Sequence, residues 1–223
     1  MSSNYCRLKR TANLLGAALV IVALTIGVPA QAAPSSETAV SAIGKLLVRG
    51  KAPMTGYERS AFSDGWASIG SCDARNYILK RDLTNLTWRD RPDCTVNTGV
   101  LKDPYTGKTI KYLRGVKTSM AVQIDHVVAL AAAWRTGAQN ISAELRYELA
   151  NDPLNLLAVD GPTNSRKSDA DAATWLPPKK SFRCKYVARQ IAVKLKYQLW
   201  LVQAEKDAML RVLETCPGQL LPQ

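Results

Sequence analysis

A small set of polar residues in the second half of the chain has the types that phosphodiester hydrolysis requires. The sequence contains one histidine, His126, and Asp125 directly precedes it; Asn155, Asn164 and Lys167 follow in that order. A neutral imidazole can accept the proton of an attacking water near pH 7, and carboxylate and amide oxygens are ligands that Mg²⁺ prefers. A metal ion there would neutralise charge on the leaving oxygen. The set therefore favours metal-assisted hydrolysis.

Each of these residues also has an ordinary structural interpretation. A lone histidine near apolar neighbours often only satisfies a buried hydrogen bond. Asn155 could be a turn residue and Asn164 a helix cap. The order Asp-His, Asn, Asn and Lys is what favours catalysis over these alternatives.

Two short strands and a helix must position the set. We expect a strand over Val122–Val128, on which alternation puts Asp125 and His126 on opposite faces, so both reach one phosphate only if the strand twists or bulges. A second strand should run over Asn155–Val159 and end at Asp160-Gly161-Pro162. Thr163 or Asn164 would cap the next helix and place Lys167 in its first turn, where helix amides favour phosphate.

Other elements follow from periodicity and turn residues. Two β-prone runs, Val96–Leu101 and Lys108–Leu113, flank Asp103-Pro104-Tyr105-Thr106-Gly107 and predict a hairpin. Helical spacing predicts helices over the following ranges: 35–53 with Ser35 or Ser36 as cap, 75–83, 129–135, 142–149 and 186–213. The rest of residues 57–93 has no clean periodicity.

Composition and charge restrict the class of protein. The 223 residues are 47% hydrophobic and 22% charged, which excludes a disordered tail, a collagen and a coiled coil. With 30 Lys and Arg against 18 Asp and Glu, the net charge is +12. A surplus of this size indicates a polyanionic partner or an anionic surface.

The N-terminus has the layout of a secretory signal. Arg7, Lys9 and Arg10 precede an apolar run over Leu14–Val28 that ends in Pro29-Ala30-Gln31-Ala32. The run is shorter than the roughly 18 residues of a membrane span. Cleavage after Ala32 would leave 27 basic and 18 acidic residues, a net charge of +9. We therefore expect a secreted protein without stable membrane association, in which residues 33–223 form a single domain and the chain is a monomer.

The cysteines that remain after cleavage predict disulfides. Four are left, an even number in an exported chain: Cys72, Cys94, Cys184 and Cys216. Zinc is the alternative, but no two of them lie two to four residues apart. An unbroken helix over 186–213 would keep Cys184 and Cys216 beyond the roughly 7 Å limit for a bridge. The weakest helical stretch is Leu199-Trp200-Leu201-Val202, so spacing alone leaves the pairing open.

Longer motifs around the polar set resemble a known family. The motifs are Gln123-Ile124-Asp125-His126-Val127-Val128-Ala129-Leu130, Ala133-Trp134, Gly137-Ala138, Asn151-Asp152-Pro153-Leu154-Asn155-Leu156, Asn164, Lys167, Asp169 and Trp175-Leu176-Pro177-Pro178, with Arg81-Asp82-Leu83 and 103–107 upstream. Together they resemble the exported HNH endonucleases of actinobacterial type, whose nuclease domain is shared with modification-dependent restriction enzymes. The resemblance runs from about Tyr57 to Cys216.

The resemblance implies an α+β fold with a ββα-metal (HNH, His-Me finger) core at about residues 95–180, a β-hairpin and flanking helices. In it, His126 matches the general base and Asn155 the residue that holds the loop and imidazole geometry. Asp125 and Asn164 match the metal ligands, and Lys167 resembles a phosphate contact. There is no second histidine, so Mg²⁺, or Mn²⁺, is expected rather than zinc.

The resemblance also implies a break in the C-terminal helical segment (184–215) near 199–203. This break would pair Cys184 with Cys216 and leave Cys72 for Cys94.

We therefore expect a secreted, metal-dependent endonuclease that cuts DNA, or RNA, with little sequence specificity. The alternative is a secreted basic protein that binds DNA or another polyanion through a non-catalytic HNH scaffold; a delivered toxin is a third possibility. Tryptophans and arginines outside the set could stack bases or follow a phosphate backbone, but none is assigned to the substrate. These residues are Trp66, Trp88, Trp134, Trp175, Trp200, Arg75, Arg81 and Arg89.

Overall fold

The structure is a computed structural model that describes residues 37–89 and 93–222. The signal segment predicted for residues 1–32 lies outside these ranges, as do Ser35 and Ser36. Residues Ser36–Gln223 cluster as one unit by their internal contacts. None of the helices in the described ranges has the length and apolar character needed to cross a membrane.

The strands pair antiparallel in three small sheets. The predicted hairpin is confirmed: β4 (Val96–Lys102) pairs with β5 (Thr109–Leu113), and the turn has Gly107 at a positive φ of 79°. The strand β3 (Leu83–Trp88) joins the other edge of β4 and was not predicted. Two very short strands, β1 (Ser68–Ile69) and β2 (Cys72–Asp73), also pair.

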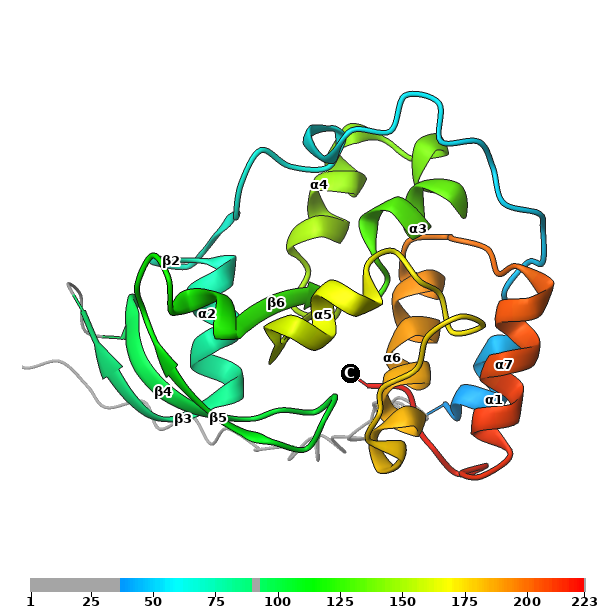
Figure 1. Cartoon of the computed structure of the whole chain (residues 1–223). Helices are drawn as coiled ribbons and strands as arrows, with labels where there is room; N and C mark the ends of the chain where they lie inside the picture. The colour runs from blue at the N-terminus through cyan, green and yellow to red at the C-terminus, as the bar shows by residue number, and fades with distance from the viewer. Residues whose placement is uncertain (1–36, 90–92, 223) are drawn as a thin grey trace, which may run out of the picture. The chain divides into compact units, whose positions relative to one another are not determined.

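A separate two-stranded sheet carries the Asp-His pair. β6 (Val122–His126) pairs with β7 (Leu156–Asp160) in continuous register, so that His126 lies opposite Leu156. The helix α5 (Gly161–Lys167) follows β7 and packs against both strands (Figure 1). The strand, strand, helix order expected from the sequence is therefore present.

The start of α5 corrects the sequence prediction. Asp160 is the N-cap, and its carboxylate accepts a hydrogen bond of 2.9 Å from the backbone N–H of Thr163. The helix therefore begins before Thr163 and Asn164, and Lys167 is its last residue rather than part of the first turn. The prediction was wrong because Asp160 both ends β7 and caps α5, which leaves no loop between them.

Except for the first, the other helices lie close to their predicted positions; the helix predicted over 35–53 is confined to five residues. They are α1 (Ala39–Ile43), α2 (Ala74–Asp82), α3 (Leu130–Arg135), α4 (Ala143–Asn151), α6 (Arg183–Lys196) and α7 (Gln203–Leu213), with short 3-10 turns at Arg59–Ala61, Ser119–Ala121, Ala138–Asn140 and Lys180–Phe182. Thr38 caps α1, and its hydroxyl accepts from the backbone N–H of Ser41. The expected break separates α6 from α7, and Gln198 takes a positive φ of 54° there.

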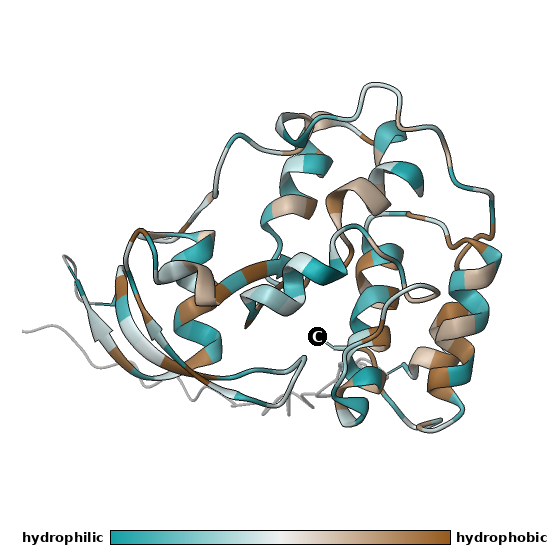
Figure 2. Cartoon of the chain, in the orientation of Figure 1, coloured by the Kyte–Doolittle hydropathy of each residue, from teal (hydrophilic) through white to brown (hydrophobic). Residues whose placement is uncertain are grey.

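The small sheet lies between two apolar clusters. Ile124 and Leu156 pack with the hairpin and α2, whereas Val127 and Val159 pack with α1, α6 and α7. Figure 2 shows apolar residues along β6 and on α7. Burial of these alternating side chains on both sides fixes the register of β6 and β7, and the register places Asp125 and His126.

Both expected disulfides are confirmed. Cys72 pairs with Cys94, and Cys184 pairs with Cys216, with Cα atoms 5.3 and 6.4 Å apart. The second pair closes because the chain reverses between α6 and α7. The fold is thus a mixed α+β structure stabilised by two disulfides.

Candidate functional site

His126 is held by a backbone carbonyl at the end of β6. Its imidazole Nε2 lies 2.8 Å from the carbonyl oxygen of Ala150, at the end of α4. A carbonyl oxygen only accepts, so Nε2 carries the proton, and Nδ1 of the neutral ring is left as the proton acceptor. The side chain is 7% exposed. The indole ring of Trp66 stacks nearly parallel to the imidazole, with centroids 6.0 Å apart.

The surroundings keep the imidazole neutral. The pKa of His126 is lowered from 6.5 to about 4. Burial is the main cause, the positive charges of Arg59 and Lys167 add to it, and the bond to Ala150 opposes it. At neutral pH the ring is therefore in its proton-accepting form.

Asp125 lies in a buried polar network. Its carboxylate Oδ1 accepts from the Lys167 ammonium at 2.9 Å, and its Oδ2 accepts from the Tyr105 hydroxyl. Burial raises the pKa of Asp125, and the bonds from Lys167 and Tyr105 oppose that rise. Each oxygen has a second lone pair, so this network orients the carboxylate and still leaves it capacity to bind a cation.

Lys167 does not lie where a phosphate contact was expected. Its side chain is fully buried, and its ammonium donates to Asp125 and, at 2.9 Å, to the carbonyl oxygen of His126. It sits at the C-terminal end of α5, where helix amides do not face a ligand. In this structure the ammonium of Lys167 bonds Asp125 inside the protein, and no part of the Lys167 side chain is exposed to meet a phosphate.

The two asparagines lie on different sides of His126. Asn155 is fully buried; its side-chain oxygen accepts from the backbone N–H of Val128 at 2.8 Å, and its amide donates to the carbonyls of Val128 and Leu149. It thereby ties the loop after His126 to the end of α4. Asn164, in α5, donates its amide to Gln123 Oε1 at 3.0 Å. Its own oxygen remains an acceptor.

A cavity of about 440 Å³ brings the reactive groups together. Asp125, His126 and Asn164 all line it, although Asp125 and His126 are neighbours on a strand without a bulge. They are the last two residues of β6. Asn155 and Lys167 do not line the cavity and lie behind it. The other lining residues are Tyr57, Arg59, Ile124, Ala129, Leu130, Ala131, Ser168 and Asp169.

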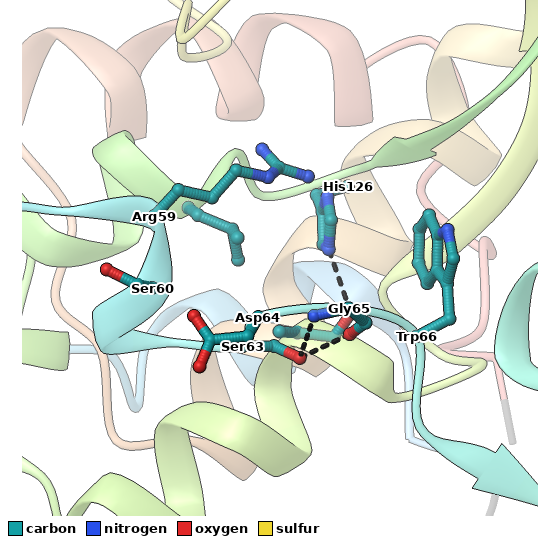
Figure 3. A pocket seen from close by; sticks show the side chains of 9 residues that line it. Arg59, Ser60, Ser63, Asp64, Gly65, Trp66 and His126 are labelled. Atoms are coloured by element: carbon teal, nitrogen blue, oxygen red, sulfur yellow. Dashed lines mark hydrogen bonds between the residues drawn. The ribbon is translucent and has the colours of Figure 1, made fainter.

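A second cavity of about 240 Å³ also reaches His126, and Figure 3 shows its walls. Arg59 lines both cavities, and Trp66 lines the smaller one. The sequence analysis assigned no role to Arg59, and it left Trp66 unassigned. Neither residue lies in a periodic segment, so no pattern connected it with His126. Tyr105 lies in the predicted hairpin turn over 103–107, but the sequence contains no signal that its hydroxyl bonds Asp125.

The donor set fits a hard divalent cation. Asp125 and Asn164 offer a carboxylate and an amide oxygen at one cavity, as Mg²⁺ prefers, and water and phosphate oxygens usually complete such sites. Within the described ranges, no group of three or more His, Cys, Asp or Glu side chains is arranged to hold a metal. The four cysteines are used in disulfides. Asp125 and Asn164 are therefore the oxygen donors that this cavity offers to a cation.

Comparison with known proteins identifies the family. Residues 73–212 match the family described as GmrSD restriction endonucleases, C-terminal domain. A protein of Arthroderma benhamiae, described as an uncharacterized secreted protein, is 37% identical over 186 residues, which cover 82% of this chain and 87% of the relative. No solved structure matches the chain. The family match over residues 73–212 includes the hairpin, the Asp-His strand and most of α5 to α7. The chain therefore belongs to the family of GmrSD restriction endonuclease C-terminal domains.

Proposed function

We propose that the protein is a secreted, metal-dependent HNH endonuclease that hydrolyses phosphodiester bonds in DNA with little sequence specificity. The observation that carries the proposal is one cavity lined by a neutral, oriented imidazole, a carboxylate and an amide oxygen. Membership of a restriction-endonuclease domain family supports nuclease chemistry at this cavity.

His126 is the proposed general base. With Nε2–H donated to Ala150, the ring can accept a proton from an attacking water only at Nδ1. The negative charge of a bound phosphate would raise the pKa of the imidazole and make it a stronger base once substrate is present. The free protein keeps the ring unprotonated, and the substrate supplies the charge that favours proton uptake.

Asp125 and Asn164 are the proposed metal ligands. Mg²⁺, or Mn²⁺, held by their oxygens would supply neutralisation of charge on the leaving oxygen. Lys167 and Tyr105 orient Asp125, because they bond its two carboxylate oxygens. Asn155 holds the loop that follows His126. These three residues act as positioning residues in a ββα-metal core made of β6, β7 and α5.

Charge and cysteine chemistry support the substrate and the location. A net charge of +9 after signal cleavage near Ala32 favours a polyanion. Two disulfides are typical of proteins that fold in oxidising compartments, and the relative is described as secreted.

Cleavage of plasmid DNA by the oxidised protein from Ala33 onward tests the proposal. Mg²⁺ or Mn²⁺ should support cleavage, EDTA should abolish it, and H126A should lose at least about 100-fold in rate. N164A should weaken activity in a way that extra Mg²⁺ partly restores. A folded H126A variant with full activity would remove His126 as the base.

A second outcome concerns the alternative function. A folded protein that binds the plasmid but cuts nothing with any divalent metal would instead be a polyanion-binding protein, because its positive charge alone explains binding. Near-UV circular dichroism of each variant establishes that it is folded.

A further inference from the structure

The segment before the family domain forms a wall of the site. The family match begins at residue 73, whereas Tyr57, Arg59 and Trp66 line the two cavities beside His126. The segment therefore adds groups that the matched region does not contain.

This segment is fixed in place by the core. Phe62 is 2% exposed and packs edge-on against Trp134 of α3, with ring centroids 6.1 Å apart. The guanidinium of Arg146, in α4, donates to the carbonyl oxygen of Ala61 at 2.9 Å. The backbone N–H of Ala67 donates to the side-chain oxygen of Asn151 at 2.8 Å. Tyr57 also packs edge-on against Trp134, with ring centroids 6.0 Å apart. Contacts on both sides of Arg59 therefore hold this segment beside the core.

Arg59 is the unusual group in this wall. Its side chain is exposed, and among residues 37–89 and 93–222 its guanidinium has no hydrogen-bond or ion-pair partner. Figure 3 shows the guanidinium directed toward the imidazole of His126. The guanidinium therefore lies at the cavity beside a ring that carries no charge, and an anion bound there would be its partner.

The nearby carboxylates do not neutralise Arg59. Asp125 is bonded to Lys167 and Tyr105, and Asp169 forms an ion pair of 2.6 Å with Arg135. Asp64 lines the smaller cavity, but within the described ranges it forms no ion pair with Arg59. The guanidinium is therefore free to receive an external anion.

We propose that Arg59 binds the phosphate that is cut. The inference rests on the proposed nuclease function and adds a substrate-binding residue from outside the family domain. Arg59, His126 and Leu130 line both cavities, so a backbone that passes from one cavity to the other places a phosphate beside the guanidinium. The planar guanidinium can bond two phosphate oxygens at once and favours charge that develops on them.

Kinetics of R59Q and R59K provide the first test. R211Q is the matched control, because Arg211 is an exposed arginine on α7 that lines neither cavity. We expect R59Q to lower kcat/KM for DNA cleavage about 100-fold, mainly through kcat. R59K should recover part of this loss because it keeps the charge but not the two-pronged geometry. R211Q should stay within about twofold of the wild type.

A binding measurement that needs no catalysis provides the second test. Because His126 is the sole histidine, its imidazole NMR signals report on this site without interference. Inorganic phosphate, added at fixed pH in EDTA, should shift these signals in the wild type and in R211Q. The shift should be lost in R59Q and reduced in R59K.

The outcomes separate the two proposals. If the wild type cuts DNA, and R59Q keeps its kcat/KM within about twofold and still responds to phosphate, the role of Arg59 is overturned. If the wild type does not cut DNA at all, the nuclease proposal fails, while the NMR shift still decides whether Arg59 binds phosphate. Should R59Q fail to fold, R59K and the same NMR measurement decide the matter.

Discussion

The imidazole of His126 is oriented by a carbonyl of α4 and not by a carboxylate. A carboxylate at Nε2 would stabilise the imidazolium, whereas a neutral carbonyl fixes the tautomer with less effect on the pKa. The carboxylate of the neighbouring Asp125 is instead bonded to Lys167 and Tyr105. Two separate networks therefore orient the neutral imidazole of His126 and the carboxylate of Asp125.

The pKa of His126 is the first quantity to measure. In EDTA, its NMR signals should titrate near pH 4, well below 6.5, because burial disfavours the charged ring. Between these values the unfolded chain binds a proton that the folded chain does not. The contribution of His126 to the free energy of unfolding is therefore fully present above about pH 6.5. It falls by about 3 kcal/mol as the pH decreases toward 4. Urea unfolding at several pH values measures this slope, which H126A should lack; a pKa at or above 6.5 contradicts the prediction.

Replacement of Lys167 distinguishes two roles for this residue, support of the Asp125 carboxylate and contact with a phosphate. K167M should destabilise the fold by about 3–5 kcal/mol, because it leaves a buried carboxylate without its cation. A surface phosphate contact would instead reduce cleavage and leave stability unchanged.

Equilibrium unfolding in urea, with K111M as control, distinguishes the two roles of Lys167. Lys111 is exposed on β5, and its replacement should change stability by less than about 0.5 kcal/mol. Similar stability of K167M and K111M would contradict the supporting role and favour Lys167 as a phosphate contact.

The junction of β7 and α5 is the element that sets the site. Asp160 ends the strand and caps the helix, so Asn164 lies one turn into α5 and faces Gln123 on β6. The direct connection requires glycine at the next position, since a Cβ on Gly161 would lie 2.0 Å from the carbonyl oxygen of Met120. Close backbone approach therefore links α5 to the chain before β6.

Replacement of Gly161 tests this junction. G161A should destabilise the protein by at least about 2 kcal/mol and reduce activity, because α5 must move away from Met120 and carry Asn164 with it. G50A is the matched control, since nothing lies within 4 Å of a Cβ at Gly50. Thermal unfolding and cleavage rates measure both effects. Equal melting temperatures for the two variants would show that the backbone tolerates the methyl group.

Much of this arrangement could be predicted from sequence, element by element. Turn residues located the hairpin, and helical spacing located α2 to α4 with small errors. The start of α5 was missed because Asp160-Gly161-Pro162 has the composition of a loop, whereas Asp160 caps the helix and Gly161 begins it. The wall around Arg59 was missed because residues 57–66 are held by tertiary contacts with α3 and α4, which leave no local period. The catalytic and metal roles stay predictions.

At the scale of the whole molecule, the C-terminal helices are part of the support of the site. Val127, directly after His126, packs in one cluster with Tyr186 of α6 and Met209 of α7. Tyr105, which bonds Asp125, belongs to the same cluster. The disulfide Cys184–Cys216 joins the start of α6 to the chain just after α7 and so keeps the two helices as a closed unit.

Removal of this disulfide should therefore lower stability more than it changes the chemistry of the site. The C184S/C216S variant opens a loop with a sequence separation of 32 residues and should lose about 3–4 kcal/mol in free energy of unfolding. The C72S/C94S variant, with a separation of 22, should lose about 3 kcal/mol. Urea unfolding measures both, and cleavage assays well below the melting temperature should show nearly full activity, because neither disulfide lines the cavity of His126. Unchanged stability in both variants would mean that the core alone suffices and that folding does not depend on an oxidising compartment.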